Sequence, residues 1–280
     1  MQHLLAVMLD VHSPFVERAA AGSAINQYGD PRLGVNLRAD GLPDIAWCEV
    51  PAGSFTMGSD KDADNPTRIK TLPTFYIAKY PITYKQFQAF IDAPDGYRNA
   101  VWWHGLHLKG QKQQRVSAKE QRWKFDNHPR DRVSWYDAMA FCRWLSTKLK
   151  YVVQLPTEEE WEKAARGTDG RDYPYGCEFD SSKGNTFEMG LRQTSAVGIF
   201  LEGASPYNVL DMSGNVWEWT LTEFDTHNNS DFSNSNARVL RGGSWDYNFY
   251  SARATSRLKN FLYARDTYNG FRVVTMATEK

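Results

Sequence analysis

The residues best suited to chemistry in this chain are its three cysteines, Cys48, Cys142 and Cys177. A thiolate is a nucleophile and a soft metal ligand, but a disulfide framework or a structural zinc site needs at least two thiols close together. These three are far apart in the sequence and form no CxxC pair. We therefore expect no disulfide framework and no zinc site. Free thiols fit a reducing compartment, so we expect a cytoplasmic protein.

Other chemical motifs are equally sparse. His104 and His107 form an isolated HxxH with no third ligand nearby in the sequence, so ordinary polar packing is a simpler interpretation than a metal site. The acidic run at 158–160 is expected in the first turn of a helix, where the helix dipole favours negative charge. The sequence has neither a glycine-rich phosphate loop nor a serine nucleophile elbow.

Length and composition exclude several classes of protein. The 280 residues carry 33 Lys+Arg and 33 Asp+Glu, a balance that argues against a strongly basic nucleic-acid binder. Hydrophobic residues make up 41%, which is enough for one large core, and no run of apolar residues is long enough to predict membrane insertion. The N-terminus lacks a basic region before its apolar residues, so a cleaved signal peptide is not expected.

Few helices are predicted. Residues 1–45 are expected to form a helical arm and linker, with Ser13 as the cap and Pro14 in the first turn. Three further helices should begin at capping boxes, in which a cap side chain and a later side chain satisfy free backbone N–H groups. The pairs are Thr83 with Gln86, Ser134 with Asp137, and Thr157 with Glu160. Gly167 should end the third of these helices, and Cys142 lies on the apolar face of the second.

The last part of the chain, from Arg171, has no helical stripe and should form long loops pinned by aromatic rings and ions. Charge is also segregated along the chain. Residues 153–225 hold 14 acidic and 5 basic residues, whereas residues 237–272 hold 7 basic and 2 acidic residues. The opposite signs predict that the two segments are neighbours in space, with two independently solvated faces as the alternative.

Five short motifs lie in a fixed order along the chain: residues 50–58 (VPAGSFTMG), 155–166 (LPTEEEWEKAAR), 210–219 (LDMSGNVWEW), 241–245 (RGGSW) and 270–272 (GFR). Their order and spacing resemble the formylglycine-generating-enzyme (sulfatase-modifying factor) domain family. The resemblance covers about residues 46–276 and leaves residues 1–45 outside the domain. It implies an α+β fold, a variant of the C-type lectin fold with small antiparallel sheets, few helices and much irregular structure.

The resemblance also bears on catalysis. The family's enzymes oxidise a cysteine of a client peptide and use two cysteines, which hold copper(I), between the Gly-Gly-Ser and Gly-Phe-Arg motifs. Here residues 243–272 contain no cysteine, and only thiolates offer that ion a soft two-ligand site. We therefore expect no catalytic residues and no copper, and predict that the protein is not an enzyme.

The C-terminal segment, about residues 241–272, has a regular frame: residues 241–245 (RGGSW), Arg253, Arg257, Arg265 and residues 270–272 (GFR), which together contain five arginines. Between them lie Tyr, Asn, Asp, Ser, Thr, Phe, Leu and Ala residues. Apart from Lys259, each can be reached from an asparagine codon by replacing adenines alone. The segment thus resembles the variable region of diversity-generating-retroelement variable proteins, several of which use this lectin fold. Antibody paratopes have a similar composition. The alternative is that the rings belong to the core of a loop-rich fold.

This resemblance predicts a diversified ligand-binding surface. Its residues are Asp246, Tyr247, Asn248, Phe249, Tyr250, Ser251, Ser256, Leu258, Asn260, Phe261, Tyr263, Asp266, Thr267, Tyr268 and Asn269.

The motif at 210–219 matches a structural calcium site of the family. The resemblance gives Glu218 as a carboxylate ligand and Asp211, Gly214 and Val216 as main-chain carbonyl donors, which are oxygen ligands of the kind that Ca²⁺ prefers. A second family site would begin at Asn185, although the segment that follows departs from the family's Asp-containing loop. The alternative for Glu218 is a buried, hydrogen-bonded carboxylate between two tryptophans.

The sequence therefore predicts a non-catalytic ligand-binding protein whose C-terminal surface binds another protein. The net positive charge of residues 237–272 would favour an acidic partner, and the N-terminal arm offers a second place for association. Two alternatives remain: an enzyme or accessory factor of the sulfatase-modifying type that uses other residues, and an effector module recruited by its arm to a larger protein.

Overall fold

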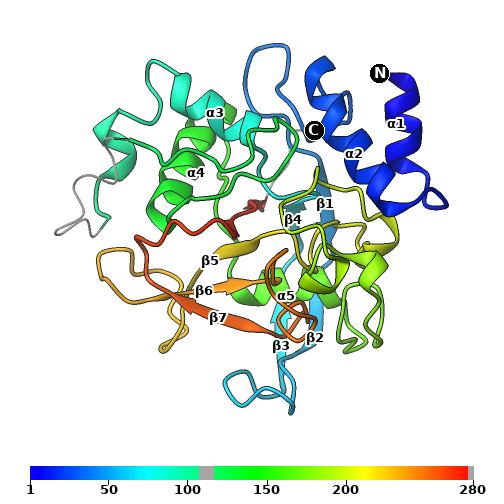
Figure 1. Ribbon diagram of the computed structural model, residues 1–280. Coiled ribbons are helices and arrows are strands. Elements are labelled where there is room, and N and C mark those ends of the chain that lie inside the picture. The colour runs from blue at the N-terminus through cyan, green and yellow to red at the C-terminus, as the bar shows by residue number, and fades with distance from the viewer. Residues whose placement is uncertain (107–116, 277–280) are drawn as a thin grey trace.

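The computed structural model describes residues 1–106 and 117–276; His107 of the HxxH motif lies outside them. The α-helices are α1 (Gln2–Leu9), α2 (Phe15–Ile25), α3 (Tyr84–Asp92), α4 (Trp135–Leu149) and α5 (Glu158–Arg166). The strands are β1 (Trp47–Val50), β2 (Gly53–Met57), β3 (Arg68–Leu72), β4 (Phe75–Ala78), β5 (Trp217–Glu223), β6 (Arg238–Arg241), β7 (Arg257–Asn260), β8 (Asn269–Gly270) and β9 (Val274–Thr275). Short helices and small sheets separated by long irregular segments make up the predicted α+β fold (Figure 1).

The predicted helix starts are confirmed. Thr83, Ser134 and Thr157 each accept a hydrogen bond from the backbone N–H three residues later, and all three capping boxes are complete. Helix α5 ends at Gly167 as predicted. On α4, Cys142 is buried with the other apolar residues of that helix, which supply much of the largest core cluster.

Three small sheets divide the strands. The largest has the order β7-β6-β5-β8, the second has the order β1-β4-β9, and β2 pairs with β3. All pairs are antiparallel except β5 with β8. Every residue of β5 is buried, which is typical of a central strand covered on both faces. Figure 1 shows β7 and the loops that follow it at one side of this sheet.

The segments between α5 and β5 and between β7 and β9 have little regular structure, as predicted. Within the described residues the first of them has only the short 3₁₀ turns 181–183, 187–189 and 201–203. Such loops bury few of their own backbone groups in sheets, so side chains must hold them in place.

The arm has two helices where the sequence predicts one. Helix α2 begins next to the predicted start, but α1 is missed because its apolar residues run together without a clear helical period. Met8 and Ile25 pack with Ile199 and Phe200, and the buried Arg18 donates hydrogen bonds to the carbonyls of Met8 and Ile199. The arm therefore lies against the 196–200 loop. Across residues 1–106 and 117–276, no helix has both the length and the apolar character needed to cross a bilayer.

Candidate binding surface

The C-terminal segment turns sharply where it leaves β6. Gly242 and Gly243 both have positive φ, 96° and 73°. A Cβ on Gly243 would lie 3.0 Å from the backbone of Ala252, so only glycine permits this close approach without strain. The turn folds residues 246–252 back against the strand, and this backbone then continues into β7.

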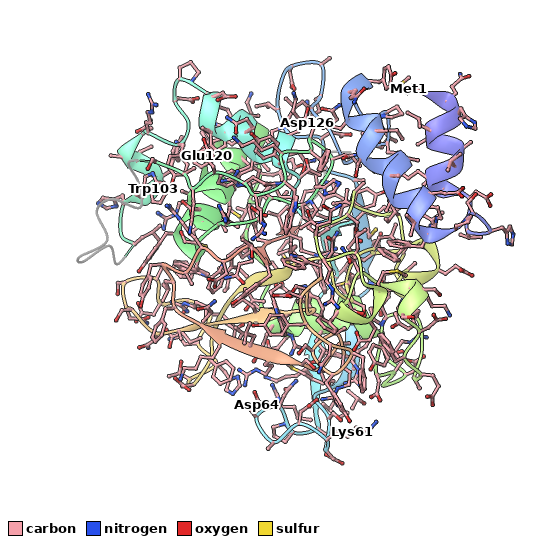
Figure 2. The ribbon with its side chains drawn as sticks, in the orientation of Figure 1. Met1, Lys61, Asp64, Trp103, Glu120 and Asp126 are labelled. Carbon is pink, nitrogen blue, oxygen red and sulfur yellow. The ribbon has the colours of Figure 1, made fainter. Side chains whose placement is uncertain are left out.

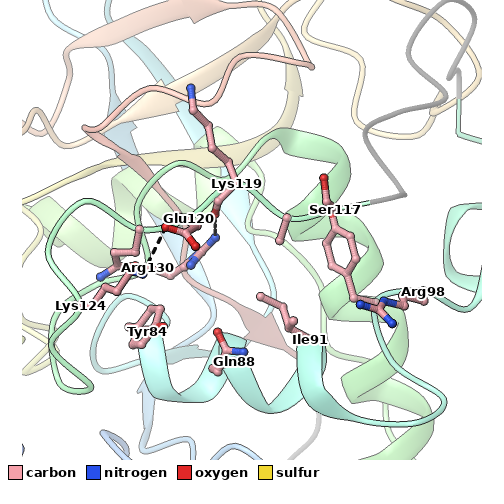
Figure 3. Close-up of a pocket in the computed structure, with 12 residues that line it drawn as sticks. Tyr84, Gln88, Ile91, Arg98, Ser117, Lys119, Glu120, Lys124 and Arg130 are labelled. Atoms are coloured by element: carbon pink, nitrogen blue, oxygen red, sulfur yellow. Dashed lines mark hydrogen bonds and ion pairs between the residues drawn. The ribbon is translucent and has the colours of Figure 1, made fainter.

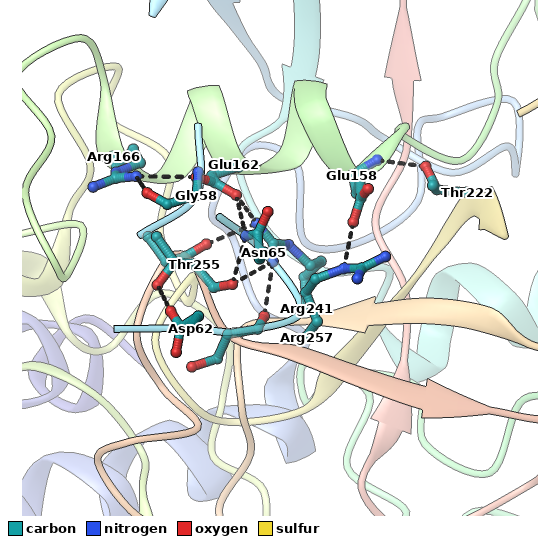
Figure 4. A network of polar contacts seen from close by, with 12 residues as sticks. Gly58, Asp62, Asn65, Glu158, Glu162, Arg166, Thr222, Arg241, Thr255 and Arg257 are labelled. Carbon is teal, nitrogen blue, oxygen red and sulfur yellow. Dashed lines mark hydrogen bonds and ion pairs between the residues drawn. The ribbon is translucent and has the colours of Figure 1, made fainter. Parts of the chain in front are cut away.

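Glu162 on α5 is the centre of the network that holds this backbone (Figure 4). Its buried carboxylate pairs with Arg241 and accepts a hydrogen bond of 2.6 Å from the Gly58 N–H. Arg166, one turn later on α5, lies 3.0 Å from the same carboxylate. Arg241 in turn donates to the main-chain carbonyls of residues 254, 255 and 256 at 2.8–2.9 Å. One guanidinium therefore fixes three successive peptide units.

The 58–67 loop supplies a second set of anchors. Its tip, with Lys61 and Asp64, lies beyond the ends of β2 and β3 (Figure 2). Asp62 pairs with Arg253, and the Asp64 carbonyl accepts a 2.8 Å hydrogen bond from Arg257. Arg257 also pairs with Glu158 of α5 at 2.8 Å.

The remaining two frame arginines pair with α4 and with β5. Arg265 pairs with Asp137 of α4 at 2.7 Å and donates to the Tyr97 hydroxyl at 3.0 Å. Arg272 is fully buried and contacts both carboxylate oxygens of Glu218, at 2.5 and 2.7 Å. All five predicted frame arginines are thus tied to carboxylates on other segments.

The acidic and basic segments are neighbours, as the charge pattern predicts. Every cation of residues 237–272 is in an ion pair: Arg238 with Glu223, Arg241 with Glu162, Arg253 with Asp62, Arg257 with Glu158, Lys259 with Asp225, Arg265 with Asp137, and Arg272 with Glu218. Because these cations are paired within the domain, the positive charge of the segment is less available to a ligand than the sequence suggests, and the acidic partner stays a prediction.

Three aromatic rings of the segment are about half exposed: Tyr250 (59%), Phe261 (57%) and Tyr263 (47%). Phe261 and Tyr263 are stacked with their ring centroids 5.7 Å apart, and Tyr250 lies 4.2 Å from the half-buried Phe249. Single exposed apolar residues are common on proteins, whereas each of these two ring pairs exposes a larger continuous apolar area than one side chain does. We call the exposed and half-exposed residues 246–251 and 256–268 the C-terminal surface.

The other predicted surface residues fall into two groups. Asp246 and Asn248 are exposed, whereas Ser251, Ser256, Leu258, Asn260, Asp266 and Thr267 are half-buried. Tyr247 and Tyr268 are also half-buried and pack edge to face with each other, with Tyr247 against Trp217 beneath them. The prediction that Asn269 belongs to the ligand-binding surface is wrong, because this residue is fully buried in β8 and its amide donates to Asp266 at 3.0 Å. Its side chain supports the loop and has no access to a ligand.

Residues 187–192 extend this surface and are missed by the sequence analysis. The Phe187 N–H donates to the Tyr247 carbonyl at 2.9 Å, and Glu188 accepts a 3.0 Å hydrogen bond from the Phe249 N–H. The Phe187 ring is 46% exposed, with the Arg192 guanidinium 3.5 Å from its centroid. No signal in the sequence links this segment to residues 247–249, because the contact joins two irregular loops about sixty residues apart.

Two of the three cysteines lie in environments that disfavour the reactive thiolate. Cys142 is buried, and desolvation raises the pKa of its thiol. Burial also raises the pKa of the half-buried Cys48, while Cys177 is exposed. A raised pKa keeps a thiol protonated and unreactive at neutral pH. All three are free cysteines and none lies in the C-terminal segment.

The residues at Glu218 do not fit a calcium ion. Both carboxylate oxygens accept hydrogen bonds from Arg272, and Trp161 donates its indole N–H to one of them at 2.7 Å. Arg272 also lies 3.3 Å from the Asp211 carbonyl, another of the predicted ligands. The guanidinium therefore occupies the oxygens that would bind the ion, and Glu218 follows the alternative of a buried hydrogen-bonded carboxylate. Gly214 and Val216 are buried beside it.

Asn185 has a different environment. Its side-chain oxygen and the hydroxyl of Thr186 are buried and have no hydrogen-bond partner among the described residues. Two such oxygens are possible ligands of Ca²⁺, although a calcium site usually also contains a carboxylate. In the part of the chain that the structure describes, no group of three or more His, Cys, Asp or Glu side chains could hold a metal ion. Calcium at Asn185 therefore stays a prediction.

Comparison with known proteins places this geometry in a family. The sulfatase-modifying factor enzyme 1-like domain matches residues 43–277. An inactive C-alpha-formylglycine-generating enzyme 2 of Mus musculus is 30% identical, over 84% of this chain and 87% of its own length. A formylglycine-generating enzyme of Bos taurus is 27% identical, over 82% of this chain and 74% of its own length. Among solved structures, Treponema denticola variable protein 1 has the same fold, with a TM-score of 0.66, 19% identity and coverage of 84% of this chain and 96% of its own. The chain therefore belongs to the sulfatase-modifying factor enzyme 1-like domain family.

Proposed function

We propose that this protein is a non-catalytic ligand-binding protein of the diversity-generating-retroelement type, which displays a diversified C-terminal surface on a C-type lectin scaffold. The observation that supports this most is the exposure of Tyr250, Phe261 and Tyr263 on a backbone whose arginines are buried in ion pairs. Rigid exposed rings give a large contact area at a low cost in side-chain entropy, which is how paratopes bind.

The hydrogen bonds that hold the segment are compatible with variation. Arg241, Arg253 and Arg257 donate mainly to main-chain carbonyls and to carboxylates outside the segment. These bonds do not depend on which side chain occupies positions 246–251. A change at one of those positions therefore alters the binding surface and leaves its support in place.

The ligand we propose is another protein. Aromatic rings beside amides suit protein surfaces in general. The internal pairing of the cations weakens the preference for an acidic partner and gives no support to nucleic-acid binding. The three free cysteines fit a cytoplasmic location. The arm is a second place for association, since Val16 on α2 is 73% exposed.

Natural sequence variation tests the proposal directly. We expect deep sequencing of this gene from a population of cells to show substitutions at the predicted surface positions between residues 246 and 268, with the five frame arginines unchanged. The gene should lie near a reverse-transcriptase gene and a near-copy of codons 241–272 that differs only at adenines. Variation spread evenly along the chain, without such a copy, would contradict the proposal.

The alternative is an enzyme or accessory factor of the sulfatase-modifying type. Relatives named as inactive and relatives named as enzymes both match this chain, so activity needs its own assay. We expect no conversion of cysteine to formylglycine in a sulfatase peptide, with or without copper, because the C-terminal segment has no thiol. Turnover that survives substitution of Cys48, Cys142 and Cys177 by serine would establish an enzyme that uses other residues.

A further inference from the structure

A cationic cavity lies beside the C-terminal surface, between α3 and residues 117–124. It has a volume of about 330 Å³, which is at the small end of the range for small-molecule sites. Figure 3 shows the Arg130 guanidinium between Lys119 and α3, with Tyr84 and Gln88 on the helix below it. Four cations line this cavity, namely Arg98, Lys119, Lys124 and Arg130, whereas Glu120 is the one carboxylate among the lining residues.

Arg130 differs from the three other arginines that are less than 2% exposed. Arg238, Arg241 and Arg272 are each buried and each paired with a glutamate. Arg130 is 1% exposed and forms no ion pair with any described residue. A buried charge without a partner is costly, so an arginine in this state is suited to receive a counter-ion from outside the chain.

The contacts of Arg130 leave part of its guanidinium free. Nη2 donates to the Lys119 carbonyl, and the group lies 5.8 and 5.0 Å from the ring centroids of Tyr84 and Phe87. Within the described residues Nε is buried without a hydrogen-bond partner, and Nη1 has none either. The two aromatic faces favour the cation but supply no opposite charge.

The carboxylates near Arg130 have other roles. Asp137 is paired with Arg265. Asp131 accepts a 3.3 Å hydrogen bond from the Arg122 N–H at one carboxylate oxygen, while its Oδ2 is buried without a hydrogen-bond partner among the described residues. Glu120 pairs with Lys124 at 3.2 Å. Asp131 and Asp137 stabilise the charge of Arg130 at longer range. Three of the four cations that line the cavity, Arg98, Lys119 and Arg130, form no ion pair with a carboxylate of the described chain.

We propose that this cavity binds a small anion, whose carboxylate or phosphate oxygens pair with Arg130 at the base while Arg98 and Lys119 act at the rim. An ionised oxygen accepts charge-assisted hydrogen bonds from a guanidinium, and these are stronger in a partly desolvated cavity than on an open surface. None of the residues that line the cavity belongs to the C-terminal surface, and the one direct link is the Lys119 ammonium, which donates to the Arg265 carbonyl at 3.5 Å. The inference therefore stands apart from the proposed function and can fail without it.

Calorimetric titration of the full chain with inorganic phosphate, and separately with citrate, in a low-salt chloride buffer tests this inference. We expect saturable binding of at least one of the two anions at about one per chain. The variants Arg98→Gln and Lys119→Met should each weaken it about tenfold, because each removes a charge close to the site. The matched control Lys70→Gln removes a lysine on β3 that pairs with Glu159 and should not change the affinity.

A second variant addresses Arg130 itself. Arg130→Met replaces an unpaired buried charge by an apolar side chain, so we expect it to fold and to melt no lower than the unliganded wild type. The anion that binds should raise the melting temperature of the wild type and leave that of Arg130→Met unchanged. The inference is overturned if neither anion binds the wild type saturably up to about 10 mM, since any binding would then be weaker than that of a millimolar complex. It is also overturned by equal binding by the wild type and by the Arg98 and Lys119 variants.

Discussion

Glu162 is the residue whose loss should damage the support of the C-terminal surface most. The carboxylate is fully buried and is contacted by Arg166, Arg241, the Asn65 amide and the Gly58 N–H. Glu162→Gln keeps the shape of the side chain but removes its charge, so two arginines lose their shared counter-ion. Breaking a buried pair in this way costs about 3–5 kcal/mol, because the remaining charge stays buried without compensation.

Thermal unfolding followed by calorimetry measures this cost. For domains of a size similar to this one, a loss of 1 kcal/mol lowers the melting temperature by about 2–4 °C, so we expect Glu162→Gln to melt about 10 °C below the wild type. The matched control is Glu159→Gln, three residues earlier on the same helix. Glu159 pairs with Lys70 at 2.5 Å on the partly exposed side of the helix, and pairs of this kind contribute at most about 1 kcal/mol.

Substitutions in the C-terminal surface should cost much less stability than the loss of Glu162. The triple variant Tyr250→Ser, Phe261→Ser, Tyr263→Ser removes three rings that are about half exposed, so we expect a loss of only about 1–2 kcal/mol, mostly from the ring contacts. If the triple variant melts as low as Glu162→Gln, or if Glu162→Gln melts like Glu159→Gln, the separation of a rigid frame from a replaceable surface is refuted.

Three further predictions test other parts of the structure. Burial raises the pKa of Asp211 to about 6, so the folded state binds this proton more tightly than the unfolded state does. Relative to Asp211→Asn, the wild type should therefore lose stability as the pH rises from about 4 to about 6. Urea unfolding at several pH values measures this loss. If calcium binds at Asn185, calcium added to chelator-treated protein should raise the melting temperature, and Asn185→Ala should abolish the rise; identical melts with and without calcium would contradict it. Removing residues 1–25 exposes Ile199 and Phe200, which pack under the arm; we expect the shortened chain to melt lower and to self-associate in analytical ultracentrifugation, and an unchanged monomer would show that the arm is dispensable.

The parts of this fold that sequence reasoning predicts are those set by local chemistry. The capping boxes at Thr83, Ser134 and Thr157 depend on residues three positions apart, and the end of α5 depends on one glycine. Charge segregation also predicts correctly that the acidic and basic segments meet. It does not predict which groups pair, because Arg241 and Glu162 are separated by 79 residues of mostly irregular chain.

Two sequence predictions that the structure does not bear out, the exposure of Asn269 and the calcium site at Glu218, share a physical cause. In a regular strand the side-chain direction alternates, so burial follows from the pattern. Asn269 lies in the two-residue strand β8 between loops, where no pattern exists, and its burial depends on the Asp266 carboxylate that it contacts. The calcium site predicted at Glu218 does not fit the structure for a similar reason: the motif is local, but the cation that occupies its carboxylate is a guanidinium from a position 54 residues away.

The use of arginine rather than lysine in the frame follows from what must be held. Arg241 reaches three successive carbonyls and one carboxylate, and Arg272 reaches Glu218 together with the carbonyls of Ala78 and Leu210. A guanidinium has five donors in a planar fork, whereas an ammonium is a single point of charge. Lysine at position 241 could keep the ion pair with Glu162 but would leave carbonyls of the 254–256 turn without partners. Since these bonds end on main-chain atoms, the frame fixes the path of the backbone and leaves the side chains between its anchors free to differ.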